Sequence, residues 1–184
     1  NSGIAVTTGV QNTFIGGLAG DATTTAANNT AVGYASLGAN TTGASNVAIG
    51  FGAGQRNTTA SNNTFLGFLT GEYNTTGTYN VAVGAIALSS NTTGGYNTAV
   101  GYGSLQENTT GNNNTAVGRL ALTANTTGTL NVAMGLNALL GNTTGASNTA
   151  LGYSSLAANT TGADNVAVGA LALDANTTAS NNTA

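Results

Sequence analysis

Charged side chains, which carry most enzyme chemistry, are scarce in this chain. Its 184 residues include two Lys or Arg, five Asp or Glu, and no His or Cys. Acid–base catalysis, thiol chemistry and zinc binding draw on His, Cys or clustered carboxylates. Ser and Thr are plentiful, but no His or Lys is present to activate them. We therefore expect no enzyme, no catalytic residue, no metal site and no cofactor. The charged residues are Asp21, Arg56, Glu72, Glu107, Arg119, Asp164 and Asp174.

The distribution of these charges excludes further classes of partner. Two arginines cannot form the basic surface that nucleic acids require, and a net charge of −3 is too small to steer partners. Polar clusters interrupt every apolar run, so no segment approaches the roughly 18 residues of a membrane span. Asp21 and Asp174 share a repeat position but lie far apart in the sequence, whereas a calcium-binding solenoid needs carboxylates at every turn. We expect neither nucleic-acid binding nor membrane insertion.

Recurring Asn-Thr-Thr triplets match the acceptor sequence for N-glycosylation. The competing interpretation, which we favour, makes the same residues turn and ladder residues of a repeat. Asn28, Asn62, Asn113 and Asn181 also match the acceptor pattern. The triplet positions that we consider for glycosylation are Asn40, Asn57, Asn74, Asn91, Asn108, Asn125, Asn142 and Asn159.

The paired threonines also raise the possibility of ice binding, in which flat Thr ladders order water. In each triplet the two threonines are adjacent, as at Thr41 and Thr42. Adjacent side chains of an extended segment face opposite ways, so only one Thr column per coil is expected to face solvent. Ice or carbohydrate binding by a solenoid therefore remains an alternative to a structural role.

A repeat of 17 residues organises the whole chain. The triplet recurs at this spacing from Asn40 to Asn176, and the same frame extends back to Val6. Ten complete units cover residues 6–175 without insertion or deletion, and residues 1–5 and 176–184 are partial units. The unit is N-T-T-G-x-x-N-[TV]-A-[VIL]-G-x-x-[AS]-L-x-x, in which position one is the Asn of the triplet. We treat residues 1–184 as one repetitive segment and, because neither end has a capping unit, as part of a longer fibre.

Each unit contains a short segment typical of a β-strand. Positions eight and ten carry Val, Thr, Ile, Leu or Met around a small residue, between an Asn at position seven and a Gly at position eleven. We expect the Asn and Gly to form turns that need positive φ or close backbone approach. These expected turn residues include Asn46, Gly50, Asn80, Gly84, Asn97 and Gly101. We expect the repeat core to include Val47, Ile49, Val81, Val83, Val100, Val117, Val132, Met134, Leu151, Val166 and Val168, together with Leu88, Leu105 and Leu122 at position fifteen.

Loss of Leu at position fifteen coincides with the appearance of Phe. Position fifteen is Gly at Gly20, Gly54 and Gly71, and all four Phe residues lie in those three units. Such exchange is typical of volume compensation in a packed interior. It predicts that position fifteen approaches positions nine and twelve, within a coil or across an interface between chains. The Phe residues are Phe14, Phe51, Phe65 and Phe68.

A unit of this length cannot bury a hydrophobic face alone, but stacked units cover one another. We therefore predict an all-β fold, a parallel β-solenoid of about ten 17-residue coils, with ladders of identical Asn and Thr side chains along its axis. Positions eight, ten, twelve, thirteen and fifteen together carry more apolar residues than one thin coil hides. This surplus predicts a second buried surface between chains, and hence a homo-oligomer or a filament.

The strings NVAIG (46–50), NVAVG (80–84 and 165–169) and NTAVG (97–101) resemble the head repeats of YadA-like trimeric autotransporter adhesins. The longer string NTTGASNTALGYSSLAA (142–158) is similar to repeats in bacterial and phage-like surface fibres that carry a C-terminal intramolecular chaperone. The resemblance implies a left-handed β-roll, three chains side by side, and a position outside the cell. It also implies that Val47 and Ile49 point into the core of the roll.

These observations together predict a non-enzymatic structural or adhesive segment of an extracellular bacterial surface fibre, acting as a rigid shaft or head. Its expected partners are copies of itself, with a host matrix protein or glycan as a further candidate. The alternatives are an ice-binding or carbohydrate-binding β-solenoid and the shaft of a phage tail fibre.

Overall fold

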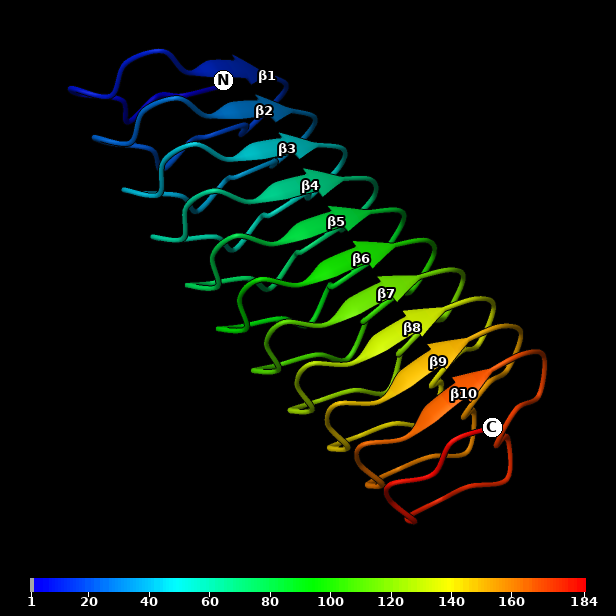
Figure 1. The fold of residues 1–184 in the computed structure, drawn as a ribbon. Helices are drawn as coiled ribbons and strands as arrows, with labels where there is room; N and C mark the ends of the chain where they lie inside the picture. The colour runs from blue at the N-terminus through cyan, green and yellow to red at the C-terminus, as the bar shows by residue number, and fades with distance from the viewer. Residues whose placement is uncertain (1) are drawn as a thin grey trace.

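The computed structural model describes residues 2–184, which form a stack of 17-residue coils with one short β-strand each (Figure 1). All strands belong to a single parallel sheet whose spatial order equals the sequence order. Each strand pairs with the next in a register of one unit, so that Thr98 lies opposite Thr115. The strands are β1 (Thr13–Ile15), β2 (Thr30–Val32), β3 (Val47–Ile49), β4 (Thr64–Leu66), β5 (Val81–Val83), β6 (Thr98–Val100), β7 (Thr115–Val117), β8 (Val132–Met134), β9 (Thr149–Leu151) and β10 (Val166–Val168). The predicted parallel β-solenoid is confirmed.

Backbone hydrogen bonds between coils continue outside the strands. This explains why strands of only three residues are enough to hold the coils together. The Thr41 N–H donates to the Thr58 carbonyl at 2.8 Å, and the Leu37 N–H donates to the Ala53 carbonyl at 3.0 Å. The backbone of the turns is therefore satisfied by the neighbouring coil, as that of the strands is. Stability rests on stacking rather than on any single coil. No helix long and apolar enough to cross a bilayer occurs within residues 2–184.

The interior of the solenoid is narrow and is filled mainly by alanine and leucine. Position nine supplies the buried side chain of each strand, and positions fourteen and fifteen supply the rest. Ala99 and Leu105, for example, are fully buried in the same coil. Phe65 is the largest fully buried side chain among the described residues. The expectation that Leu88, Leu105 and Leu122 are core residues is confirmed.

The expected core role of positions eight and ten is wrong for this chain, because both flank the buried position nine and point away from the interior. Val47 and Ile49 are 37% and 38% exposed, and Ala48 between them is fully buried. A narrow coil accepts the smallest of the three side chains, and alternation then places its branched neighbours on the outer face. The residues that were expected in the core but lie exposed or half-exposed on the outer face are Val47, Ile49, Val81, Val83, Val100, Val117, Val132, Met134, Leu151, Val166 and Val168.

The two expected turn residues have different roles. The Gly of position eleven has positive φ in every coil, including Gly50 at 136°, Gly84 at 130° and Gly101 at 126°. The expectation of positive φ is wrong for Asn46, Asn80 and Asn97, because the residue before each adopts the left-handed conformation instead, as Tyr96 does at 59°. The Asn of position seven is buried and serves as a hydrogen-bonding residue, described below.

Replacing Gly101 with alanine is expected to lower the free energy of unfolding by about 3 kcal/mol. A Cβ at this position would lie 2.6 Å from the Gly118 carbonyl oxygen of the next coil, and the φ of 126° is a region that side chains avoid. Gly95→Ala is the matched control, because position five carries alanine in other coils, as at Ala146, and its Cβ would lie 3.0 Å from the Thr78 carbonyl oxygen, farther than at Gly101. We expect the control to change stability by less than about 1 kcal/mol. Equal urea midpoints for the two variants, measured by circular dichroism, would contradict the close approach.

Candidate functional site

A ladder of buried asparagines at position seven connects every coil to the next. The Asn97 Oδ1 accepts hydrogen bonds from the backbone N–H of Asn114 at 3.0 Å and from its Nδ2 at 3.2 Å. The Asn97 Nδ2 donates to the Gly111 carbonyl at 2.9 Å. At this corner the backbone does not form β-sheet hydrogen bonds, and the Asn side-chain amide takes over that role between successive coils. The buried polar groups of the corner therefore have hydrogen-bond partners.

A second asparagine ladder at position one runs beside the first. The Asn91 Nδ2 donates to the Asn74 Oδ1 at 2.7 Å and to the Gly94 carbonyl at 2.9 Å. The same Gly94 carbonyl accepts a hydrogen bond from the Asn80 Nδ2 of the first ladder at 2.9 Å. The two ladders therefore converge on one column of backbone carbonyls at position four. The predicted Asn ladders are confirmed.

The hypothesis of glycosylation at the triplet asparagines does not fit this geometry. Each of these side chains is fully buried, and its nitrogen, the atom that would carry a glycan, is engaged in hydrogen bonds inside the stack. Asn28, Asn62 and Asn113, at position six, have exposed side chains, and their modification stays a prediction. The positions excluded in the folded chain are Asn40, Asn57, Asn74, Asn91, Asn108, Asn125, Asn142 and Asn159.

The two threonines of each triplet differ in environment, as their adjacency predicts. The Thr75 hydroxyl, at position two, donates to the Thr92 carbonyl of the next coil at 2.9 Å and is half-buried. Thr76, at position three, is exposed. Each coil therefore presents one free Thr column at this corner rather than the paired columns expected of an ice-binding face.

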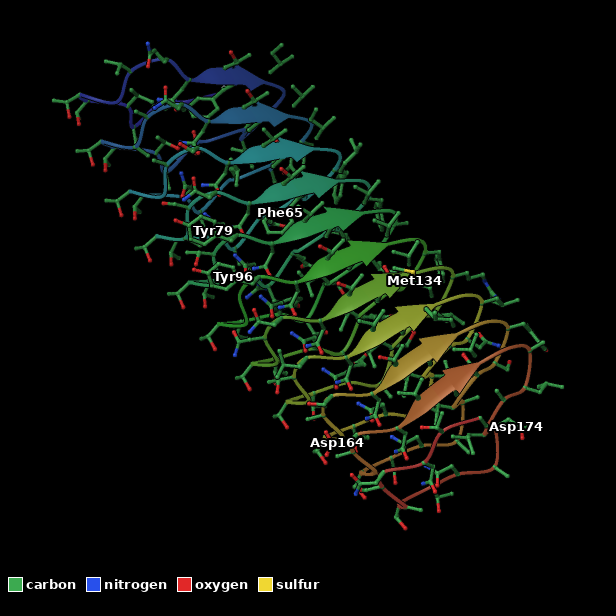
Figure 2. The ribbon with its side chains drawn as sticks, viewed as in Figure 1. Phe65, Tyr79, Tyr96, Met134, Asp164 and Asp174 are labelled. Atoms are coloured by element: carbon green, nitrogen blue, oxygen red, sulfur yellow. The ribbon has the colours of Figure 1, made fainter. Side chains whose placement is uncertain are left out.

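A largely apolar face lies on the outer side of the sheet, where position ten is apolar in every coil, position eight is Val or Thr, and position twelve is aromatic or Leu in six coils. In Figure 2 the side chains along the sheet project outward from the strands, and Met134 is labelled on this side. Tyr79, Tyr96 and Asp164, all from position six, are labelled along the opposite edge of the stack. We call the first surface the outer sheet face. Its large apolar residues of at least one-third exposure are Ile15, Tyr34, Val47, Ile49, Phe51, Leu66, Phe68, Val81, Tyr102, Val117, Met134, Leu136, Tyr153, Val166 and Val168.

Aromatic rings stack along the outer sheet face. The ring centroids of Tyr34 and Phe51 are 5.4 Å apart, and those of Phe51 and Phe68 are 5.6 Å apart. A second stack joins Tyr79 and Tyr96 at 5.0 Å on the corner at position six. The expected approach of position fifteen to position nine is confirmed, because a Cβ on Gly54 would lie 2.8 Å from the Phe65 ring. Phe51 and Phe68 at position twelve are about half-exposed in the single chain, so an approach of position fifteen to position twelve across an interface stays a prediction.

The few charged residues do not converge on a metal site. Residues 2–184 contain no group of three or more His, Cys, Asp or Glu side chains placed to hold an ion. Both guanidinium groups lie over tyrosine rings: Arg56 over Tyr73 at 4.4 Å and Arg119 over Tyr102 at 5.9 Å from the ring centroids. The expectation of no catalytic residue stays a prediction.

A hollow of about 300 Å³ near the N-terminal end was not predicted from the sequence. It is lined by residues of three successive coils. The signal for it is present in the repeat: the middle coil has Gly38 and Ala39 at positions sixteen and seventeen, where the following coil has Gln55 and Arg56. The lining residues are Leu18, Asp21, Ala35, Gly38, Ala39, Gln55 and Arg56.

The comparisons with known proteins do not assign this chain to a family. No family model matches it, and no curated protein or solved structure gives a significant match. Sequence and structure together establish a tandem-repeat parallel β-solenoid of 17-residue coils with two asparagine ladders, a fold compatible with a structural role.

Proposed function

We propose that this chain is a non-enzymatic, rigid segment of an extracellular bacterial surface fibre, and that it assembles with copies of itself through the outer sheet face. The observation that carries the proposal is that position ten of this face carries an apolar side chain in every coil, from Ile15 in β1 to Val168 in β10. Soluble proteins rarely leave a continuous apolar surface of this extent uncovered.

The area of the outer sheet face is large enough for a stable interface. Ten strands about 4.8 Å apart make a face about 48 Å long, and the five residues from position eight to position twelve make it about 13 Å wide. One chain therefore offers about 600 Å², and a pair of chains would bury about 1,200 Å², the lower end of specific interfaces. In an arrangement of three chains, the face of about 600 Å² on each chain would be shared between its two neighbours.

The repeat favours a second copy as the occupant of this face. A partner that contacts every coil must present matching groups at the same spacing of about 4.8 Å. Another copy of this chain, in register, meets that requirement over its full length without a special sequence. Three copies side by side is the arrangement implied by the similarity of the NVAIG-type strings to trimeric adhesin heads.

Rigidity and repetition support a shaft or adhesive role. The asparagine ladders couple each coil to the next, so bending the stack would break buried hydrogen bonds. A near-neutral surface rich in Asn and Thr limits nonspecific charge binding. Identical coils also repeat any weak contact with a host matrix protein or glycan, and several such contacts together give avidity.

Charge substitutions on the outer sheet face test the proposal. We expect the triple variant Ile49→Glu, Val83→Glu, Val117→Glu to weaken self-association at least about tenfold, because three charges per chain would be desolvated in the interface. The matched control is Thr42→Glu, Thr76→Glu, Thr110→Glu, which places the same charges in the same coils at the exposed position three.

Sedimentation velocity of the wild type and both variants provides the comparison, with circular dichroism to verify the fold. The wild type and the control should sediment as the same oligomer, and the outer-face variant should sediment as a chain of 17.7 kDa. An outer-face variant that retains the wild-type mass would show that another surface holds the oligomer together.

A further inference from the structure

The hollow near the N-terminal end lies where one coil has small residues between two coils with larger ones. Gly38 stands at position sixteen between Asp21 and Gln55, and Ala39 stands at position seventeen before Arg56. The middle coil thus forms a floor, and its neighbours form two walls. The walls are separated by two coil spacings, about 10 Å between backbones, so a ligand there would be held by side chains from both sides.

The walls bring together unlike polar groups around an apolar floor. Asp21 provides hydrogen-bond acceptors, Arg56 provides donors, and the Gln55 amide provides both. Leu18 and Ala35 add apolar surface. Two of the seven charged residues of the chain, of opposite sign, line this one hollow.

The two charged groups are not paired with each other. The Asp21 side chain is half-buried: its Oδ1 is shielded from solvent and has no hydrogen-bond partner among residues 2–184, so the other carboxylate oxygen is the one offered to a ligand. The Arg56 guanidinium carbon lies 4.4 Å from the centroid of the Tyr73 ring, a cation–π contact that orients the group. Unsatisfied or solvent-facing polar groups that converge on a concave, partly apolar surface are typical of a small-molecule site.

We propose that this hollow binds a single sugar unit of a glycan. Sugar hydroxyls donate and accept at once, so that neighbouring hydroxyls can donate to Asp21 and accept from Arg56 and Gln55. The apolar C–H face of the ring packs on Leu18 and Ala35. A volume of about 300 Å³ suits one such ring. A metal ion fits less well, because the lining has one carboxylate and a cation beside it.

This assignment deepens the proposed function, since it rests on the adhesive role and gives that role a ligand class and a location. The site belongs to one place in the stack, whereas the outer sheet face extends along all coils. Recognition by the hollow would therefore be a specific, single contact per chain, and assembly of several chains would multiply it.

The test is saturation-transfer NMR of the full chain with glucose, galactose, N-acetylglucosamine, glucuronic acid and glycine as separate probes. Gly38→Gln fills the hollow with the residue that position sixteen carries at Gln55 and Gln106. Ala157→Gln is the matched control, because it introduces the same glutamine at position sixteen in a coil outside the hollow. Arg56→Ala removes the donors of one wall.

We expect at least one of the sugars to receive saturation from the wild type and from Ala157→Gln. Binding should be lost in Gly38→Gln and weakened about tenfold or more in Arg56→Ala. Absence of transfer to every sugar, transfer that survives in Gly38→Gln, or binding of glycine alone would overturn the assignment. Sedimentation of the same samples separates this result from the assembly proposal, because Gly38→Gln lies off the outer sheet face and should leave the oligomer mass unchanged.

Discussion

Replacing Phe65 with alanine is expected to lower the free energy of unfolding by about 4 kcal/mol. The side chain is fully buried, and it occupies the space of position fifteen in two successive coils. A Cβ on Gly54 would lie 2.8 Å from Phe65 Cδ2, and a Cβ on Gly71 would collide with Phe65 Cε1. One ring thus fills the volume that two leucines fill elsewhere, and its removal leaves a cavity that the rigid ladders cannot close.

Two leucine substitutions are expected to recover part of the stability lost in Phe65→Ala. The triple variant Phe65→Ala, Gly54→Leu, Gly71→Leu restores alanine at position nine and leucine at position fifteen, the combination found in the coil of Ala82 and Leu88. Leucine tolerates the backbone there, since Leu88 has a φ of 53° and Gly71 has a φ of 59°. We expect the triple variant to recover about half or more of the lost stability.

Urea unfolding monitored by circular dichroism measures both effects. Gly71→Leu alone is the informative control, because it places a leucine against an unchanged Phe65 and should destabilise by at least about 2 kcal/mol. If the triple variant were no more stable than Phe65→Ala, the exchange of one ring for two leucines would not explain the three exceptional units.

Replacing Asn97 with alanine is expected to cost about 3 kcal/mol of unfolding free energy. The substitution removes the acceptor of the buried Asn114 backbone N–H, which donates to Asn97 Oδ1 at 3.0 Å. It also removes the hydrogen bond from Asn97 Nδ2 to Gly111. The Gly111 carbonyl keeps its bond from Asn108, so the orphaned N–H is the largest part of the loss.

The control for this variant is Thr93→Ala in the same coil. The Thr93 side chain is exposed at position three, and we expect its removal to change stability by less than about 0.5 kcal/mol. Amide hydrogen exchange provides a local measurement: the Asn114 amide should lose protection in Asn97→Ala and keep it in Thr93→Ala. Unchanged protection at Asn114 would contradict the proposed role of the ladder.

The period and the constant residues of the repeat were enough to predict the fold. A 17-residue unit without insertions, with a branched–small–branched segment between Asn and Gly, predicts stacked parallel strands, and β1–β10 follow that register throughout. The relation of position fifteen to Phe65 was also visible, because Gly54 and Gly71 lose the leucine where the ring appears.

Alternation alone could not predict which face of each strand is buried and which is exposed. Alternation places Val47 and Ile49 on one side and Ala48 on the other, but it does not say which side is interior. Hydrophobicity favours the branched pair, whereas the space left beside Leu at position fifteen admits only alanine at position nine; Phe65 fits there because position fifteen is Gly54 and Gly71. The way in which the turns close buries the triplet asparagines such as Asn91. Asparagine is equally common in exposed turns, so the residue type alone does not predict this burial.

The hollow at Gly38 could not be predicted from the sequence because its lining depends on how the coils stack. Asp21, Gln55 and Arg56 lie far apart in the sequence and belong to positions that vary from unit to unit. They become neighbours only because stacking places equivalent positions about 4.8 Å apart. The sequence signal for the site is that Gly38 is the only glycine at position sixteen in the ten complete units.

Light scattering of the wild-type chain after size-exclusion chromatography is the most direct test of assembly through the outer sheet face. We predict a mass of about three times 17.7 kDa that holds on dilution, because three faces of about 600 Å² each would be buried together. A mass of 17.7 kDa at every concentration would contradict the proposal, because the apolar outer sheet face would then be stable in water without a second copy.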